Sequence, residues 1–144
     1  WTMLLRGQAA LAYWNTQGGA AACPAPAAPG GGLVCDAPAY KALRSSNEAL
    51  QSWLSTQPRD PLAWGMLAQG EEALGQRLRA MRAQAEARAA LGDINGAIDR
   101  LRTAQSLVRS GGANDFIEGS IIDARLRQLE AMRREITAEL RGSK

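Results

Sequence analysis

The apolar residues of this sequence recur with the period of an α-helix, and glycine or proline interrupts them again and again. A helix brings residues three and four apart onto one face, whereas a half-buried strand needs an apolar residue at every second position. No segment of the 144 residues shows sustained alternation. The chain is also rich in alanine, leucine, arginine and glutamate, which favour helices, and poor in valine and threonine. We therefore expect an all-α protein without a sheet.

Six helices are predicted between these interruptions. Their ranges are 1–16, 37–56, 61–74, 77–91, 94–109 and 115–140. Asp36, Asp60 and Asp115 precede three of them and can accept hydrogen bonds from the first free amides of a helix. Gly75 and Gly92 follow two others, where a chain commonly leaves a helix in the left-handed conformation. The links between the middle helices are short, so neighbouring helices should run antiparallel.

The last predicted helix is the longest and carries one apolar seam. The seam consists of Ile122, Leu126, Leu129, Ile136 and Leu140. Residues at this spacing share one side of a helix, so we expect the whole seam to face the other helices.

The segment 17–36 differs in kind, because proline, glycine and alanine dominate it. Such a composition predicts a long loop inserted between the first two helices. Cys23 and Cys35 are the only cysteines, and both lie here. A disulfide between them would close a loop of about a dozen residues and stabilise the fold by roughly 3 kcal/mol in the chain-entropy model. It would also indicate an oxidising compartment. Two free thiols are the alternative.

The chain contains no histidine, which excludes Ser-His-Asp triads and the H-E-x-x-H zinc motif within it. Two cysteines cannot form a four-thiolate zinc site. Asn114, Asp115, Glu118 and Asp123 form a polar group, but their spacing does not match a calcium-binding loop. We therefore predict no metal, no cofactor and no catalysis by this chain alone. Hydrolysis by carboxylates alone is the remaining enzymatic alternative.

Charge and hydropathy limit the partners. The 17 basic and 14 acidic side chains are interspersed along the predicted helices, which does not favour a nucleic-acid partner. No apolar run approaches the length of a transmembrane helix. The sequence begins at Trp1 without the charged region of a signal peptide, so we expect a piece of a longer protein or a mature product.

Two groups of residues are candidates for contacts with a protein partner. The first group contains seven arginines: Arg77, Arg79, Arg82, Arg88, Arg100, Arg102 and Arg109. Arginine can bind carboxylates through two parallel hydrogen bonds, so the first four in particular could bind acidic or extended segments. A solvated helix surface is the favoured interpretation.

The second group contains the four tryptophans, Trp1, Trp14, Trp53 and Trp64. Aromatic side chains dominate many binding surfaces, and Trp14 and Trp53 are the candidates for such a role. Packing between helices is the favoured interpretation for all four, and above all for Trp64.

A repeat of about 34 residues fits the middle of the chain in two overlapping frames. Counted from Pro61, the positions for large, small and glycine residues of a tetratricopeptide unit are taken by Trp64, Leu67, Ala68, Gly75, Ala80 and Ala87. Counted from Leu78, they are taken by Met81, Ala85, Gly92, Ala97, Leu101 and Ala104. The expected organisation is one domain over 1–144: a degenerate first unit over 1–57 with an insertion at 17–36, two overlapping units over 58–110, and a long helix over 113–140. A generic antiparallel helical array is the alternative.

Residues 82–105 and 120–130 resemble the C-terminal tetratricopeptide region of bacterial periplasmic M48-family zinc metalloproteases of the β-barrel assembly-enhancing type. The resemblance covers residues 58–140 and extends loosely over 1–57. In that family the H-E-x-x-H motif belongs to an N-terminal protease domain, so none of its catalytic residues maps onto this chain.

The resemblance implies a TPR-like α-solenoid that acts as a non-catalytic protein-interaction module in the periplasm. Its partners would be proteins or extended peptides, such as outer-membrane proteins, their assembly machinery or the cognate protease domain. Two alternatives remain open. The chain could be a structural domain that packs on its own protease domain and gates it, or a free-standing adaptor.

Overall fold

The computed structural model describes residues 2–23, 35–111 and 115–143. Within these ranges the chain forms six α-helices and one short 3-10 helix, and it contains no strand. The helices are α1 (Thr2–Thr16), η1 (Gly19–Ala22), α2 (Pro38–Thr56), α3 (Pro61–Ala73), α4 (Arg77–Ala90), α5 (Ile94–Arg109) and α6 (Phe116–Gly142). The expected all-α class is confirmed, and the six predicted helices are present with ends that differ by one or two residues.

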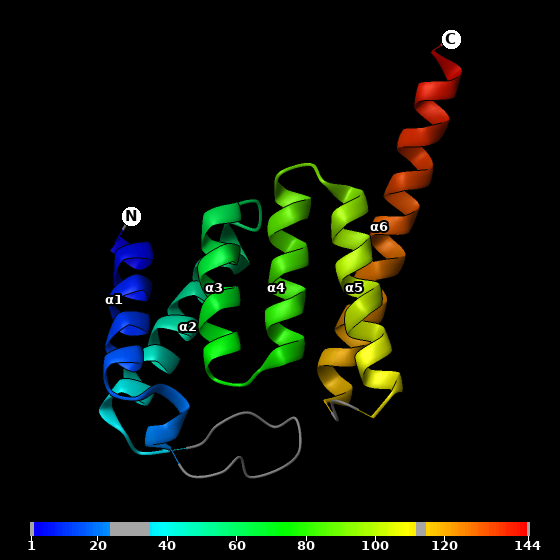
Figure 1. Cartoon of the computed structure of the whole chain (residues 1–144). Helices are drawn as coiled ribbons and strands as arrows, with labels where there is room; N and C mark the ends of the chain where they lie inside the picture. Colours follow the sequence, from blue (N-terminus) through cyan, green and yellow to red (C-terminus); the bar gives the residue numbers. More distant parts are fainter. Residues whose placement is uncertain (1, 24–34, 112–114, 144) are drawn as a thin grey trace.

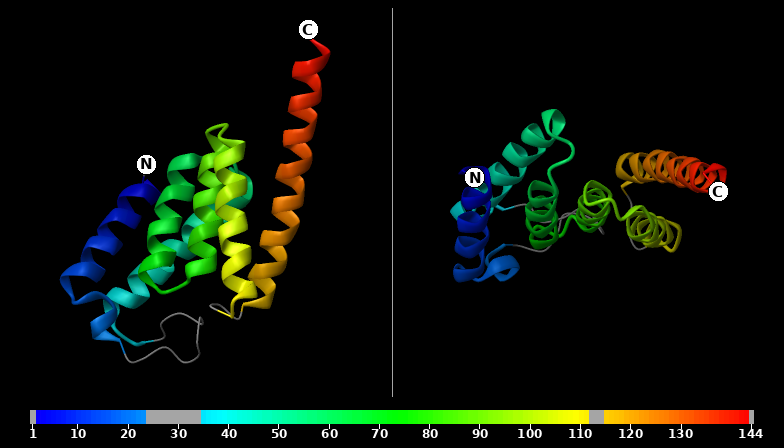
Figure 2. Two further views of the ribbon diagram at one scale, coloured as in Figure 1. Left: turned by 45° about the vertical axis from the view of Figure 1, so that its right-hand side comes forward. Right: turned by 90° about the horizontal axis from the view of Figure 1, so that it is seen from above.

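Four of the helices form one layer, and the other two lie behind it. Helices α1, α3, α4 and α5 stand side by side, and we call the surface that they turn toward the viewer in Figure 1 the front face. The view from above in Figure 2 places α2 and α6 on the opposite side of this layer. Helix α2 contacts α1 and α3, and α6 contacts α5 and α4.

Local capping explains several helix boundaries. The carboxylate of Asp60 accepts hydrogen bonds from the amides of Leu62 and Ala63, both at 3.1 Å. Asp115 caps α6 in the same way, by accepting from the amide of Glu118 at 3.0 Å. These bonds satisfy amides that have no partner within their own helix, so both predicted caps are confirmed.

The predicted cap at Asp36 is wrong. Helix α2 begins one residue later, with Ala37 at the cap position and Pro38 as the first helical residue. Alanine has no side-chain acceptor, and no side-chain hydrogen bond caps this end of the helix. Proline at the first position fixes the backbone for a helix and removes one amide that would otherwise need a partner.

The two predicted turn glycines end α3 and α4 as expected. Gly75 has φ 76° and Gly92 has φ 86°, both in the left-handed region that strongly favours glycine. The short links that follow reverse the chain, so α3, α4 and α5 pack as antiparallel neighbours.

The buried apolar side chains form three clusters along the layer. One lies between α4, α5 and α6 around Ile98, Leu101, Ile122 and Leu129. The second lies between α2, α3 and α4, and the third joins α1 to α2 around Trp14, Tyr40 and Leu43. Each cluster connects helices that neighbour one another in sequence, which is the arrangement expected of an elongated helical array.

The predicted seam of α6 is buried only over its first half. Ile122, Leu126 and Leu129 are buried, whereas Ile136 and Leu140 are 43% and 64% exposed. The reason is visible in Figure 1, where the C-terminal turns of α6 extend past the ends of the other helices. The prediction that the whole seam faces the other helices is therefore wrong for its last two residues. In the described part of the chain, no helix is both long and apolar enough to cross a membrane.

Candidate partner-binding groove

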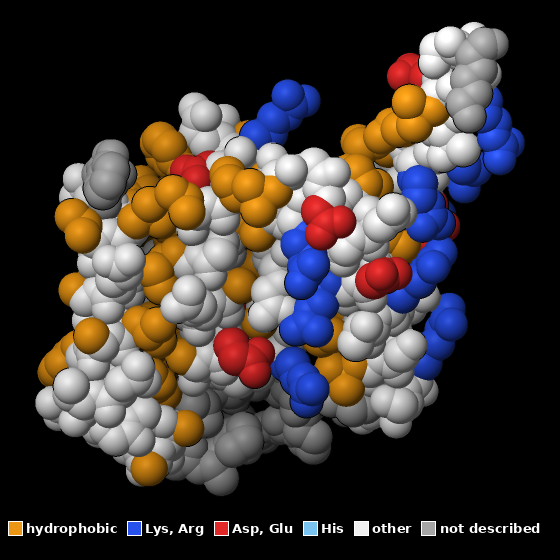
Figure 3. Space-filling view, turned by 45° about the horizontal axis from the view of Figure 1, so that its top comes forward, with side chains coloured by type: hydrophobic (Ala, Val, Ile, Leu, Met, Phe, Trp, Pro, Cys, Tyr) orange, Lys and Arg blue, Asp and Glu red, His pale blue; other side chains and the backbone are white. Residues whose placement is uncertain are grey.

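The front face carries a groove of about 980 Å³ that runs across four helices. Its lining residues are Leu11 from α1; Gly65, Ala68, Gln69, Glu72 and Ala73 from α3; Gln84, Ala87 and Arg88 from α4; and Leu91, Asp93 and Arg100 from the α4–α5 turn and α5. Figure 3 shows hydrophobic side chains over α1 and α3 on this side of the molecule, and basic side chains gathered over α4 and α5.

Small residues create the groove. Gly65 and Ala68 on α3 and Ala87 on α4 leave a shallow floor, because glycine and alanine do not fill the space above their helices. Leu11 and Leu91 contribute larger side chains, and Leu91 is 73% exposed. The groove therefore offers apolar surface that is already formed in this structure.

Hydrogen bonds orient the charged groups of the groove. Arg88 donates to the Oδ2 atom of Asp93 at 3.3 Å, while the Oδ1 atom of Asp93 caps α5 by accepting from the amide of Gly96 at 2.9 Å. Arg100 donates through Nε to the side-chain oxygen of Gln84. The structure thus brings one of the four principal candidate arginines, Arg88, into the groove, together with Arg100.

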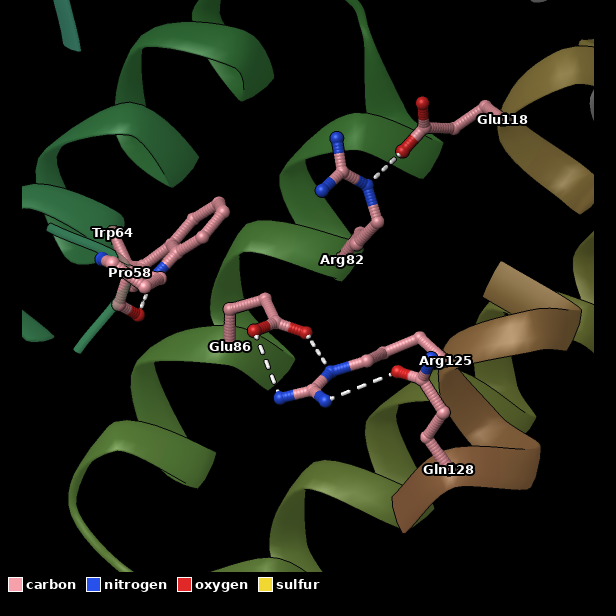
Figure 4. Close-up of polar contacts among 7 residues, drawn as sticks. All are labelled: Pro58, Trp64, Arg82, Glu86, Glu118, Arg125 and Gln128. Atoms are coloured by element: carbon pink, nitrogen blue, oxygen red, sulfur yellow. Dashed lines mark hydrogen bonds and ion pairs between the residues drawn. The ribbon is translucent and has the colours of Figure 1, made fainter. Parts of the chain in front are cut away.

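The other arginines of α4 do not all share this side of the helix. Successive residues of a helix are turned by about 100°, so Arg79 and Arg82 lie far around α4 from Arg77 and Arg88. Arg82 forms an ion pair with Glu118 of α6 and lies 6.0 Å over the ring of Trp64 (Figure 4). Arg82 thus joins helices to one another, and its proposed role in binding a partner is not supported by this position.

The remaining candidate arginines lie outside the groove. Arg77, Arg79 and Arg109 are exposed. Arg102 is half-exposed and pairs with Glu130 of α6 at 3.3 Å.

A second ion pair ties α4 to α6 on the side opposite the groove. The two oxygens of Glu86 accept from Nε and Nη2 of Arg125, at 2.5 and 3.2 Å (Figure 4). Such a two-bond pair fixes both side chains. A hollow of about 560 Å³ lies beside it, lined by both apolar and charged residues of α4, α5, α6 and the link between α2 and α3.

Two of the three tryptophans that the structure describes, Trp14 and Trp64, are buried between helices. Trp14 is only 3% exposed, and its ring lies 6.4 Å from that of Tyr40, so it cannot present its side chain to a partner in this structure. Trp64 is buried and donates to the carbonyl oxygen of Pro58 at 2.8 Å. Trp53 is 39% exposed and lines a separate hollow of about 230 Å³ between α1, α2 and α3. Trp1 lies outside the described residues.

Helix α3 also contains a buried carboxylate, Glu71, which the sequence patterns do not predict. It is 3% exposed and accepts a hydrogen bond from Nε2 of Gln51 at 2.9 Å. Burial raises the pKa of Glu71 above its ordinary value, and the positive charge of Arg79 opposes this effect. No local pattern reveals such a residue, because its neighbours come from three other helices.

Cys23 and Cys35 lie at disulfide distance, as the predicted pairing requires. Their Cα atoms are 5.3 Å apart, and both side chains pack against the cluster that joins α1 to α2. The segment between them, 24–34, lies outside the described residues.

The acidic residues near the start of α6 have structural partners. Asp115 caps the helix, Glu118 pairs with Arg82, and Asp123 accepts from Nε2 of Gln105 at 2.8 Å. Asn114 lies outside the described residues. Among the residues that the structure covers, no cluster of three or more His, Cys, Asp or Glu side chains is placed to hold a metal ion.

No protein-family model and no curated protein matches this chain. The groove combines a floor of small apolar residues with charged groups that hydrogen bonds orient.

Proposed function

We propose that this chain is a non-catalytic protein-binding module with a TPR-like architecture, and that it binds an extended peptide segment in the groove of the front face. The groove itself is the observation that carries this proposal. Its volume of about 980 Å³ is at the upper end of the range for ligand sites, and its floor is made of small apolar residues from two helices.

The contacts between helices support the TPR-like part of the proposal. Helix α1 contacts both α2 and α3, and α4 contacts both α5 and α6. In a tetratricopeptide array, the first helix of each unit contacts its own partner helix and the first helix of the next unit. The repeat frame that begins at Leu78 likewise makes α4 the first helix of a unit. Small residues at its packing positions, such as Ala85 and Ala97, are fully buried.

The family resemblance of residues 58–140 suggests which segments would bind. In that family the corresponding module serves a periplasmic zinc protease that acts on outer-membrane proteins, so we propose the same setting here. Strands of such proteins alternate apolar and polar residues. An extended segment of this kind can place its apolar side chains on the groove floor. A cysteine pair at disulfide distance is compatible with an extracytoplasmic location.

The test is to fill the groove without disturbing the fold. Gly65 lines the groove, and a Cβ atom added there would meet no atom within 4 Å, so Gly65→Phe should project a ring into the groove. Leu62→Phe is the matched control, because Leu62 lies in the same helix, is 68% exposed and does not line the groove.

The probe is a set of fluorescein-labelled 12-residue peptides with alternating apolar and polar residues, measured by fluorescence anisotropy. We expect Gly65→Phe to weaken binding on the order of 10-fold or more, and Leu62→Phe to bind like the wild type. Equal binding by the wild type and Gly65→Phe would show that the peptide binds outside the groove. No binding by the wild type would overturn the proposal.

A further inference from the structure

We propose that the groove selects extended segments that carry an acidic side chain, and that Arg100 binds this carboxylate while neighbouring apolar residues lie over Ala68 and Ala87. This inference rests on the proposed function, because it names the kind of segment that the groove takes. Arg100 lines the groove and is only partly buried, so its side chain is within reach of a segment bound there.

The hydrogen bond to Gln84 prepares Arg100 for this role. The bond uses Nε, and the guanidinium has further N–H groups on its two terminal nitrogens. Gln84 is a neutral amide, so it orients the guanidinium without neutralising its charge. Arg82, Arg88 and Arg125 differ in this respect, because each contacts a carboxylate of the same chain. A carboxylate from a partner can bind the terminal nitrogens of Arg100 through two parallel hydrogen bonds.

The other charged groups of the groove leave only one favourable place for the acidic side chain of a bound segment. Asp93 also lines the groove, but its carboxylate is paired with Arg88 and caps the first turn of α5, so Arg88 offsets its negative charge. Glu72 lies on α3 and would repel a second carboxylate there. Figure 3 shows the same division, with basic side chains over α4 and α5 and hydrophobic ones over α1 and α3. The segment therefore places its acidic residue beside α5 and its apolar residues toward α3.

The test compares two blocked peptides of 12 residues with alternating leucine and serine. They differ at one central polar position, which is aspartate in one and asparagine in the other. We expect the wild-type protein to bind the aspartate peptide about 10-fold tighter or better, as is typical of a hydrogen bond to a charged group. Raising the salt concentration should reduce this preference.

Arg100→Gln should remove the preference for aspartate, and Arg100→Lys should retain part of it, since lysine keeps the charge but not the planar fork. Arg102→Gln is the matched control, because Arg102 lies two residues away and pairs with Glu130 outside the groove. Thermal unfolding of each variant verifies that it is folded.

The outcomes separate the two proposals. Equal binding of both peptides by the wild type overturns the role of Arg100 and leaves the groove as a peptide site. A preference that persists in Arg100→Gln, or disappears in Arg102→Gln, also overturns the role of Arg100. If neither peptide binds the wild type while other alternating peptides do, the groove does not select acidic segments, and the proposed function stands. If no alternating peptide binds the wild type, both proposals are wrong.

Discussion

At the level of single residues, burial controls the behaviour of Glu71. Its carboxylate is removed from water between α2, α3 and α4, and burial outweighs the favourable effects of Arg79 and of the hydrogen bond from Gln51 on the charged form. The pKa of Glu71 in the folded protein is therefore raised. The unfolded chain loses this proton at a lower pH than the folded one, so folding becomes less favourable as pH rises from the ordinary glutamate range through the raised pKa. Above that pKa the penalty is complete.

Glu71→Gln should therefore stabilise the protein at neutral pH. Glutamine keeps a side-chain oxygen that can accept from Gln51, but it carries no charge. We expect the melting temperature to rise by a few degrees at pH 8, since about 1 kcal/mol corresponds to roughly 3–4 °C for a chain of this size. The difference in melting temperature between Glu71→Gln and the wild type should shrink toward pH 4, where the side chain of residue 71 is largely neutral in both proteins. A variant that is less stable at pH 8 would show that the attraction to Arg79 and Arg82 dominates.

Asp60 shows the opposite shift. The indole of Trp53 donates to its Oδ2 atom at 3.0 Å, and this bond, together with those from the amides of Ala63 and Leu62, holds the pKa of Asp60 below its ordinary value. The ionised form therefore contributes stability above the ordinary aspartate pKa, and this contribution is lost as pH falls through the lowered pKa.

Asp60→Ala should remove the cap of α3 and the bond to Trp53, at a cost of about 1–2 kcal/mol in urea unfolding at pH 7. Asp60→Asn is the control, because asparagine is an equally good cap residue. This variant should lose much less of the free energy of unfolding. Equal destabilisation by both variants would assign the effect to the charge instead of the cap.

At the level of elements, a close approach between α2 and α3 depends on Gly70. A Cβ atom at Gly70 would lie 2.0 Å from Oδ1 of Asn47, which is itself buried in α2. Gly65 occupies the same helix but has open space around it. The two glycines therefore allow a matched comparison within one helix.

Gly65→Ala should stabilise the protein by about 0.5–1 kcal/mol, because alanine favours a helix interior. Gly70→Ala should instead destabilise it by roughly 1–3 kcal/mol, since the amide of Asn47 must move. Adding Asn47→Ala should relieve most of the loss caused by Gly70→Ala. The free energies of unfolding of Gly70→Ala, Asn47→Ala and the double variant, each compared with the wild type, test this coupling. Additive effects at Gly70 and Asn47 would contradict the close approach.

The elements that the sequence predicted well are those controlled by neighbouring residues. Asp60 and Asp115 cap helices, and Gly75 and Gly92 end them, through interactions within one turn. Asp36 also had a capping residue type, yet the chain starts α2 one residue later. Local propensity alone does not fix such a choice when proline follows.

The elements of the candidate site were harder to predict, because they depend on distant helices. The burial of Glu71 and the pairing of Arg82 with Glu118 require α3, α4 and α6 to meet. Counting arginines along residues 77–109 did not separate the two sides of α4, although the helical period could have done so. The exposure of Leu140 depends on where the other helices end, which no pattern within α6 records.

At the level of the whole molecule, α4 connects two halves. It packs against α3 on one side and α5 on the other, and the ion pairs of Arg82 and Glu86 tie it to α6. The same helix contributes Ala87 and Arg88 to the groove. Changes in the packing of α4 should therefore affect both the stability of the array and the shape of its front face.

The link between α1 and α2 contains both cysteines of the chain. Helix α1 buries only Gly7, Ala10 and Trp14, so apolar packing holds it less firmly than the central helices. A disulfide between Cys23 and Cys35, which are 12 positions apart, would restrict the unfolded chain and stabilise the fold by roughly 3 kcal/mol. Reduction with a dithiol, or Cys23→Ser with Cys35→Ser, should lower the free energy of urea unfolding by about this amount. Two titratable thiols in the untreated protein, or an unchanged unfolding midpoint after reduction, would contradict the bond.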